Sequence, residues 1–115
     1  VGAALLTKEG KVYQGCNIEN AAYSPSVCAE RTAFFKAVYE GERNFKAIAI
    51  MGGPETVKGP DCDICAPCGI CRQVMMEFCD PGTFEILLGT PEKYEIYTLK
   101  EILPLGFGSA NLKKK

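Results

Sequence analysis

Two short stretches place cysteines beside charged side chains at the starts of two segments with helical patterns. SVCAERTAFFKAV carries Cys28, Glu30 and Arg31, and CAPCGICRQVMMEF carries Cys68 and Cys71. Helix N-termini expose unpaired N–H groups and the positive end of the helix dipole, which favour thiolates. Thiolates bind zinc well, and cysteines at i and i+3 of one helix can reach a single ion at about 2.3 Å. The sequence therefore predicts a zinc site formed by Cys28, Cys68 and Cys71.

Three protein ligands leave one position of a tetrahedral zinc ion open, which is typical of catalytic sites. Glu30 is two residues beyond Cys28, so it lies near that position without having to be a ligand. An activated water molecule beside a proton-shuttling carboxylate suits hydrolytic attack at an electron-poor carbon. Three thiolates and one divalent ion carry a net charge of about −1. Arg31 and the two helix N-termini are available to offset this charge.

The cysteines also allow a non-catalytic interpretation. Cys62, Cys65, Cys68 and Cys71 recur with two residues between neighbours, which suits a closed four-cysteine zinc site or an iron–sulfur site in a metal-binding module. That arrangement leaves the CAER stretch without a purpose. The chain contains no histidine, which excludes Ser–His and Cys–His nucleophilic schemes and histidine-ligated metals.

Composition narrows the classes of partner. A chain of 115 residues is long enough for one domain with a substantial core. The 13 Lys and Arg residues against 14 Asp and Glu residues give a formal net charge of −1, which does not favour nucleic acid or an anionic membrane. The apolar runs are far shorter than a bilayer-spanning helix requires. We therefore expect a soluble, cytoplasmic protein whose partner is a small neutral ligand or another protein.

Hydrophobic periodicity predicts the elements that position these side chains. Strands over 2–7 and 11–16 form a hairpin across KEG, and a helix over 28–40 begins with a capping box of Ser26 and Glu30. FKAIAIMG is typical of a strand that is covered on both faces. Residues 52–67 are predicted to form a loop, and the residues after it form a second helix that ends at CDPG. TFEILLG and YEIYTL follow as strands, and TLKE opens a short helical turn. This order predicts one α/β domain over residues 1–115 whose main helices cross between neighbouring strands.

CNIENAAY, VCAER and PCGICRQVM resemble the homotetrameric zinc-dependent cytidine deaminases, in the variant of the zinc-deaminase pattern that has cysteine in place of histidine. The resemblance covers nearly the whole chain. It implies a three-layer α/β/α sandwich with a five-stranded mixed sheet, and it leads us to expect that the family's leading helix is missing before Val1. It also implies a pyrimidine-salvage enzyme that converts cytidine and deoxycytidine to uridine and deoxyuridine with release of ammonia.

The resemblance also assigns roles to individual residues. Cys28, Cys68 and Cys71 bind zinc, and Glu30 protonates the ring nitrogen and relays protons to the departing amine. The implied contacts to substrate come from a further set of positions: Asn17, Glu19, Tyr23, Ala29, Ala66 and Phe107. Of these, Asn17 and Glu19 meet the ribose hydroxyls, the backbone near Ala29 and Ala66 meets the base, and Tyr23 lines the site or a subunit contact. Phe107 reaches a neighbouring subunit's base pocket, so the resemblance implies a homotetramer with shared active sites.

Two further enzyme classes share parts of this pattern. A deaminase of a cytosine nucleoside antibiotic such as blasticidin S has the same metal motifs, although NIENAAY suits a plain ribose better. A deaminase of bases inside polynucleotides is disfavoured because the chain lacks a basic groove signal.

Overall fold

The first two strands form the hairpin that the KEG turn predicts. The computed structural model describes residues 1–24, 26–52, 66–90 and 93–113. β1 (Gly2–Thr7) pairs antiparallel with β2 (Val12–Cys16). In the turn between them, Gly10 has a φ of +97°, a left-handed conformation that glycine adopts without steric cost.

Three more strands complete one sheet. β3 (Phe45–Met51), β4 (Glu85–Gly89) and β5 (Tyr94–Thr98) join the hairpin in the order β2-β1-β3-β4-β5. Only the β3–β4 pair is parallel among these neighbours, and the other pairs are antiparallel. The α/β class and the five-stranded mixed sheet are therefore confirmed.

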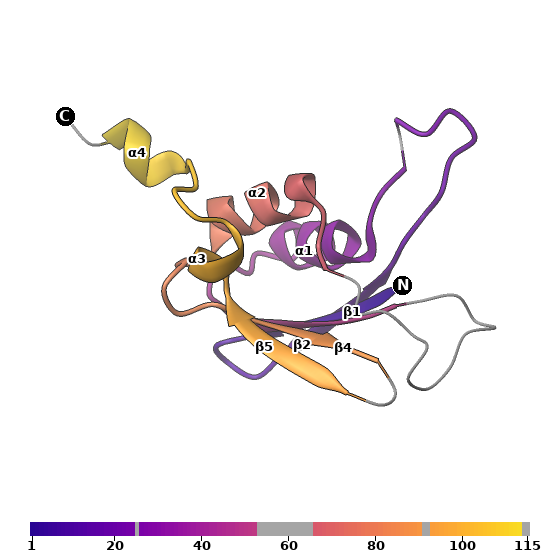
Figure 1. Ribbon diagram of the computed structural model, residues 1–115, viewed down its shortest axis with the longest axis horizontal. Coiled ribbons are helices and arrows are strands. Elements are labelled where there is room, and N and C mark those ends of the chain that lie inside the picture. The colour runs from indigo at the N-terminus through magenta and orange to yellow at the C-terminus, as the bar shows by residue number, and fades with distance from the viewer. Residues whose placement is uncertain (25, 53–65, 91–92, 114–115) are drawn as a thin grey trace.

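The two main helices lie on the same face of the sheet. α1 (Ala29–Tyr39) connects β2 to β3, and α2 (Gly69–Phe78) connects β3 to β4. Both connections join parallel strands and move in the same direction along the sheet, so right-handed crossovers put both helices on one side. Figure 1 shows α1 and α2 side by side above the sheet. Their N-termini consequently meet at the edge where β2 and β3 end, which brings the two cysteine motifs together.

The core fills the space between these helices and the sheet. Phe34 of α1 is fully buried, and its ring lies 5.2 Å from that of Phe45, 6.4 Å from that of Phe78 and 6.0 Å from that of Phe84. Burying an aromatic or large aliphatic side chain of this kind contributes roughly 1.5–3 kcal/mol. The aromatic cluster thus holds α1 and α2 against the sheet at a fixed spacing.

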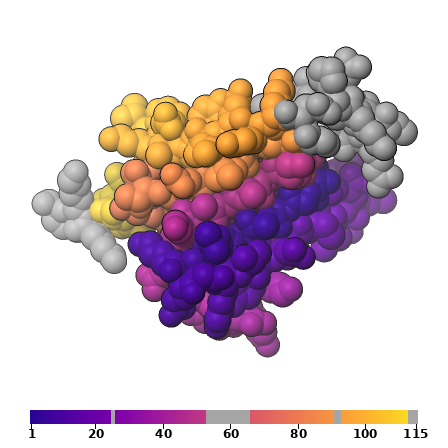
Figure 2. All heavy atoms as spheres, turned by 90° about the horizontal axis from the view of Figure 1, so that it is seen from below, coloured from indigo at the N-terminus to yellow at the C-terminus, as the bar shows by residue number. Residues whose placement is uncertain are grey.

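The opposite face of the sheet carries no helix from the described residues. Figure 2 shows this face with the strands in colour order, from orange β5 through magenta β3 to indigo β1 and purple β2. Val12, Met51 and Ile96 are each about half exposed. Of the two helical layers of the expected sandwich, the described residues contain one. The coverage of β3 that we expected on both faces is accordingly seen on one face.

The starts of the helices differ from the prediction at one point. Cys28 is the N-cap residue of α1, with extended φ and ψ of −73° and 156° and no side-chain cap. The predicted capping box of Ser26 and Glu30 is therefore wrong. Ser26 Oγ instead accepts a hydrogen bond from the backbone N–H of Asn20 at 2.9 Å, because an antiparallel bridge between Ile18 and Val27 folds this loop back on itself.

The C-terminal part contains two short helices. The predicted capping box of Thr98 and Glu101 is confirmed and opens α3 (Leu99–Ile102). α4 (Ser109–Lys113) was not predicted, because five residues give too little periodicity and its start lacks the usual Glu or Gln signal. Asn111 takes that place and accepts a hydrogen bond from the Gly108 N–H at 2.8 Å. Within the described ranges, the helices are all too short or too polar to cross a bilayer.

Gly15→Ala is expected to destabilise the fold by about 1–3 kcal/mol, the usual cost of overpacking. A Cβ atom at Gly15 of β2 would lie 2.5 Å from Ala29 O and 2.7 Å from Ala33 N, both backbone atoms of α1 that cannot move independently. Urea unfolding measures the effect. Gly2→Ala on the neighbouring strand is the matched control, since its Cβ meets nothing within 4 Å. Equal stability of the two variants would contradict this prediction.

Candidate metal centre and substrate cavity

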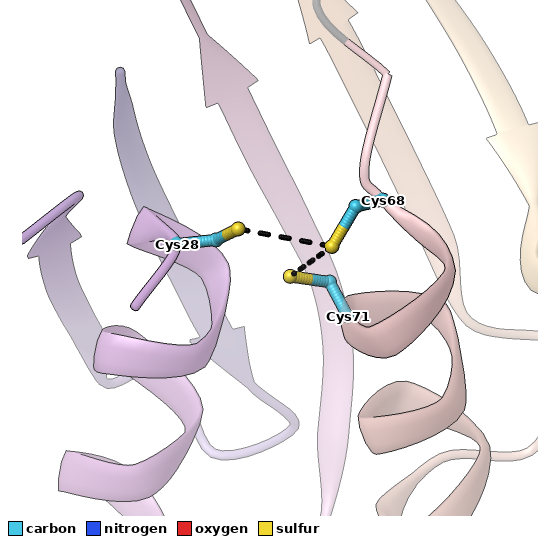
Figure 3. A group of neighbouring side chains, drawn as sticks. All are labelled: Cys28, Cys68 and Cys71. Carbon is cyan, nitrogen blue, oxygen red and sulfur yellow. Dashed lines mark hydrogen bonds between the residues drawn. The ribbon is translucent and has the colours of Figure 1, made fainter. Parts of the chain in front are cut away.

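Three cysteine side chains converge where the two main helices begin. Cys28 and Cys68 are the N-cap residues of α1 and α2, and Cys71 lies buried in the first turn of α2. Figure 3 shows the three thiol groups pointing toward one another. Cys28 Sγ lies 3.7 Å from Cys68 Sγ, and Cys68 Sγ lies 3.4 Å from Cys71 Sγ. All three sulfur atoms lie within 4.8 Å of one another.

This donor set fits zinc. Sulfur ligands at about 2.3 Å from a tetrahedral zinc ion are about 3.8 Å apart, close to the observed sulfur separations. In the part of the chain that the structure describes, no other Cys, Asp or Glu belongs to the group. Cys62 and Cys65, the other members of the evenly spaced cysteine run, lie outside the described residues. The described residues therefore offer three ligands and leave a fourth position, the pattern of a catalytic zinc site.

The two cysteines of α2 differ in their electrostatic environments. Burial alone raises the pKa of the Cys68 thiol, but hydrogen bonds with the Cys71 backbone and with the Cys71 and Cys28 side chains outweigh it and lower the pKa. Burial raises the pKa of the Cys71 thiol, and the hydrogen bond to Cys68 and the charge of Glu30 raise it further. A bound cation favours deprotonation of both thiols, so zinc binding releases protons from this cluster.

Arg31 lies against the sulfur atoms, as expected for a residue that offsets their charge. Its Nη2 atom donates to Cys28 Sγ at 3.6 Å and to the Ser26 carbonyl at 3.5 Å. The hydrogen bond to Cys28 is the main reason that the pKa of Arg31 is raised, although burial opposes it. Its Nε atom is buried and has no hydrogen-bond partner among the described residues. The guanidinium thus places a permanent positive charge at the metal centre.

A cavity of about 220 Å³ opens beside the sulfur atoms. Glu30 lines it and is only 4% exposed, so its carboxylate is shielded from bulk water next to Cys28 and Cys68. Three predicted substrate contacts also line it, namely Asn17, Ala29 and Ala66. Sequence analysis missed Val1 and Ile50, which line the same cavity. Ile50 was recognisable only as a strand residue, because its place at the carboxyl end of β3 depends on the order of strands in the sheet.

The remaining predicted contacts lie elsewhere. A second cavity of about 620 Å³ adjoins the metal centre and is lined by Glu19 and Tyr23, together with Asn17 and Cys28, which also line the first cavity. Tyr23 is 85% exposed. Phe107 lines neither cavity, and its side chain is 58% exposed while its carbonyl accepts a hydrogen bond from Gln73 Nε2 at 2.7 Å.

Several known proteins resemble this chain in both sequence and fold. Residues 1–85 match the family described as "Cytidine and deoxycytidylate deaminase zinc-binding region". The chain is 48% identical over 112 residues to a cytidine deaminase from Sporosarcina psychrophila, covering 97% of this chain and 77% of the relative. It is 31% identical over 108 residues to a blasticidin-S deaminase from Bacillus cereus, covering 93% of this chain and 76% of the relative. The crystal structure of a cytidine deaminase from Burkholderia pseudomallei superposes with a TM-score of 0.81 at 43% identity, covering 92% of this chain and 80% of that one.

Proposed function

The chain belongs to the zinc-binding cytidine and deoxycytidylate deaminase family, and on this basis we propose that it catalyses hydrolytic deamination of cytidine and deoxycytidine. The products are uridine or deoxyuridine and ammonia. One observation carries the proposal: three sulfur ligands from two helix starts converge beside a cavity that also holds a buried carboxylate. A closed structural zinc site has no need of that carboxylate.

Cys28, Cys68 and Cys71 would hold the zinc ion, which would supply Lewis-acid activation of a water molecule. Glu30 is the proton carrier. Its carboxylate takes one proton from the attacking water and delivers it to the ring nitrogen beside C4 of the pyrimidine. It then takes the second proton from the hydroxyl group added at C4 and passes it to the amine, which leaves as ammonia when the C4–N bond breaks. Because Glu30 is 4% exposed, these protons pass between the carboxylate and the substrate and are not lost to bulk solvent.

The substrate contacts extend from the metal centre toward the second cavity. Ala29 and Ala66 line the 220 Å³ cavity, which supports the proposal that their backbone groups meet the polar edge of the base. Asn17 lines both cavities and Glu19 the larger one, so the ribose extends from the first cavity toward the second. An amide and a carboxylate together satisfy the donor and acceptor needs of sugar hydroxyls that lose their water on binding.

Asn17→Ala is expected to raise the KM for cytidine about 2- to 10-fold, since a neutral hydrogen bond contributes roughly 0.5–1.5 kcal/mol. Glu19→Gln is expected to raise it about 10- to 100-fold, since a hydrogen bond involving a charged group contributes roughly 1.5–3 kcal/mol. The zinc content should stay at the wild-type value, because neither residue belongs to the sulfur group. Steady-state kinetics with cytidine measures the effect. Asn44→Ala, at an exposed position before β3, is the control and should leave KM unchanged. Unaltered KM in both site variants would remove these residues from the substrate site.

We also propose that residues 1–115 form a single domain. Four such chains form a cytoplasmic homotetramer whose subunits share their active sites. The exposure of Tyr23 and Phe107 supports shared sites, since apolar side chains so exposed are suited to a contact with another subunit. Reduced thiol ligands suit the cytoplasm, where disulfides are rare, and nucleoside deamination suits pyrimidine salvage. Sedimentation velocity measures the assembly, and a monomer with full activity would contradict shared sites.

One assay tests the proposed function directly. Purified protein with about one zinc per chain should decrease the absorbance of cytidine and of deoxycytidine as each is deaminated. Blasticidin S, tested in parallel, should react more slowly, because the antibiotic deaminase is the more distant relative at 31% identity against 48%. Faster turnover of blasticidin S than of either nucleoside would show that the chain is a deaminase of the antibiotic.

A further inference from the structure

Arg72 follows Cys71 in α2 and connects two separate parts of the chain. Its Nε atom donates to the Pro67 carbonyl at 2.9 Å, and its Nη1 atom donates to the Ile102 carbonyl at 2.6 Å. Its backbone N–H also donates to the Cys68 carbonyl at 3.0 Å. One residue thus holds two consecutive carbonyls of the segment that carries the ligand Cys68.

Both carbonyls bound by the guanidinium need a donor. Pro67 is fully buried, and a buried carbonyl without a partner costs free energy. Ile102 is the last residue of α3, where the final carbonyl groups have no partner within the helix. A guanidinium offers five donors in a rigid planar fork, so it can serve two acceptors in different directions at the same time.

α3 provides a firm anchor for this bridge. Its first residue, Leu99, is fully buried and donates its N–H to the Phe84 carbonyl at 3.1 Å. The next residue, Lys100, donates its N–H to the Pro81 carbonyl at 2.9 Å. α3 is therefore tied to the segment that leads into β4. Through Arg72, the segment that carries Cys68 is attached to α3 and therefore to the segment that leads into β4.

We propose that Arg72 is a positioning residue for the metal centre, which holds Cys68 at the place where its sulfur can share one ion with Cys28 and Cys71. Cys28 belongs to α1 and approaches from the other helix, so the sulfur separations of 3.7 Å and 3.4 Å depend on where the Pro67–Cys68 segment lies. The inference rests on the proposed function only in requiring that the three sulfur atoms bind zinc.

The test compares Arg72→Ala and Arg72→Lys with Arg43→Ala. Arg43 makes a similar pair of bonds, from Nη1 to the Val38 carbonyl at 3.1 Å and to the Glu42 carbonyl at 2.7 Å, but it lies beyond the end of α1 opposite Cys28. Zinc affinity is measured by competition with a chelator, and the visible absorption of the Co²⁺-loaded protein reports the ligand geometry. Unfolding of the zinc-free forms measures the structural contribution, and kinetics with cytidine separates kcat from KM.

Both Arg72 variants should bind zinc about 10- to 100-fold more weakly, the usual loss when a residue that orients a ligand is removed. Their Co²⁺ spectra should change and kcat should fall with KM for cytidine nearly constant, while Arg43→Ala keeps wild-type zinc affinity. Wild-type zinc affinity and spectra in Arg72→Lys would show that positive charge alone suffices and would overturn the proposal. A loss of zinc-free stability in Arg72→Ala without a change in zinc affinity would overturn it equally. If the wild type binds zinc but does not deaminate cytidine, the proposed function fails while the zinc measurements still decide the role of Arg72.

Discussion

Glu30→Gln should lower kcat for cytidine by about 10²- to 10⁴-fold, the range for loss of a general acid–base group, while the protein retains about one zinc per chain. Glutamine has nearly the same shape as glutamate but cannot take up and return a proton. Glu30 lies outside the group of three sulfur atoms, so zinc binding should survive the change. The decrease in cytidine absorbance and the zinc content, measured on the same samples, test both parts of this prediction.

Glu40→Gln is the matched control for this change. Glu40 is the exposed C-cap residue of the same helix, at the end opposite the metal centre. It should retain wild-type kcat, KM and zinc content. Turnover by Glu30→Gln within about twofold of wild type would show that another group carries the protons. Loss of zinc from Glu30→Gln would instead show that the carboxylate helps to hold the ion.

Cys28→Ser is expected to abolish both stoichiometric zinc binding and turnover. A serine hydroxyl stays protonated near neutral pH and is a poor zinc ligand, whereas zinc binds the thiolate form of cysteine. Cys28 is also the one ligand of the group that α1 contributes among the described residues, so its loss leaves only the pair from α2. Metal analysis after dialysis, followed by the cytidine assay, measures the effect.

Two control variants separate this site from the alternative use of the cysteines. Cys16→Ser changes an exposed thiol at the end of β2 and should behave as wild type. Cys62→Ser combined with Cys65→Ser should also retain zinc and activity. In a non-catalytic module built on the evenly spaced cysteine run, the double variant would lose its metal and Cys28→Ser would keep it. That reversed pattern would contradict the catalytic site.

The elements and the chemical character of the site were predictable because both depend on short stretches of sequence. The hairpin follows from alternating residues around KEG, and the helix over 28–40 matches α1 to within one residue at each end. Cysteine at i and i+3 implies thiolate ligation of one ion wherever that helix lies. The capping box of Ser26 and Glu30 is the exception, because the bond between Ser26 and Asn20 depends on how the loop folds back, which a short stretch of sequence does not show.

The convergence of the site required the three-dimensional packing. Cys28 and Cys68 are 40 residues apart, and they meet because β2 and β3 run parallel on either side of β1, with both crossover helices on one face. Packing also divides the predicted contacts between two cavities, exposes Phe107, and joins Arg72 to Ile102 across 30 residues. Local patterns specify which side chains an element carries, whereas strand order and the close packing of the core set their separations, and a metal site depends on those separations to within a few tenths of an ångström.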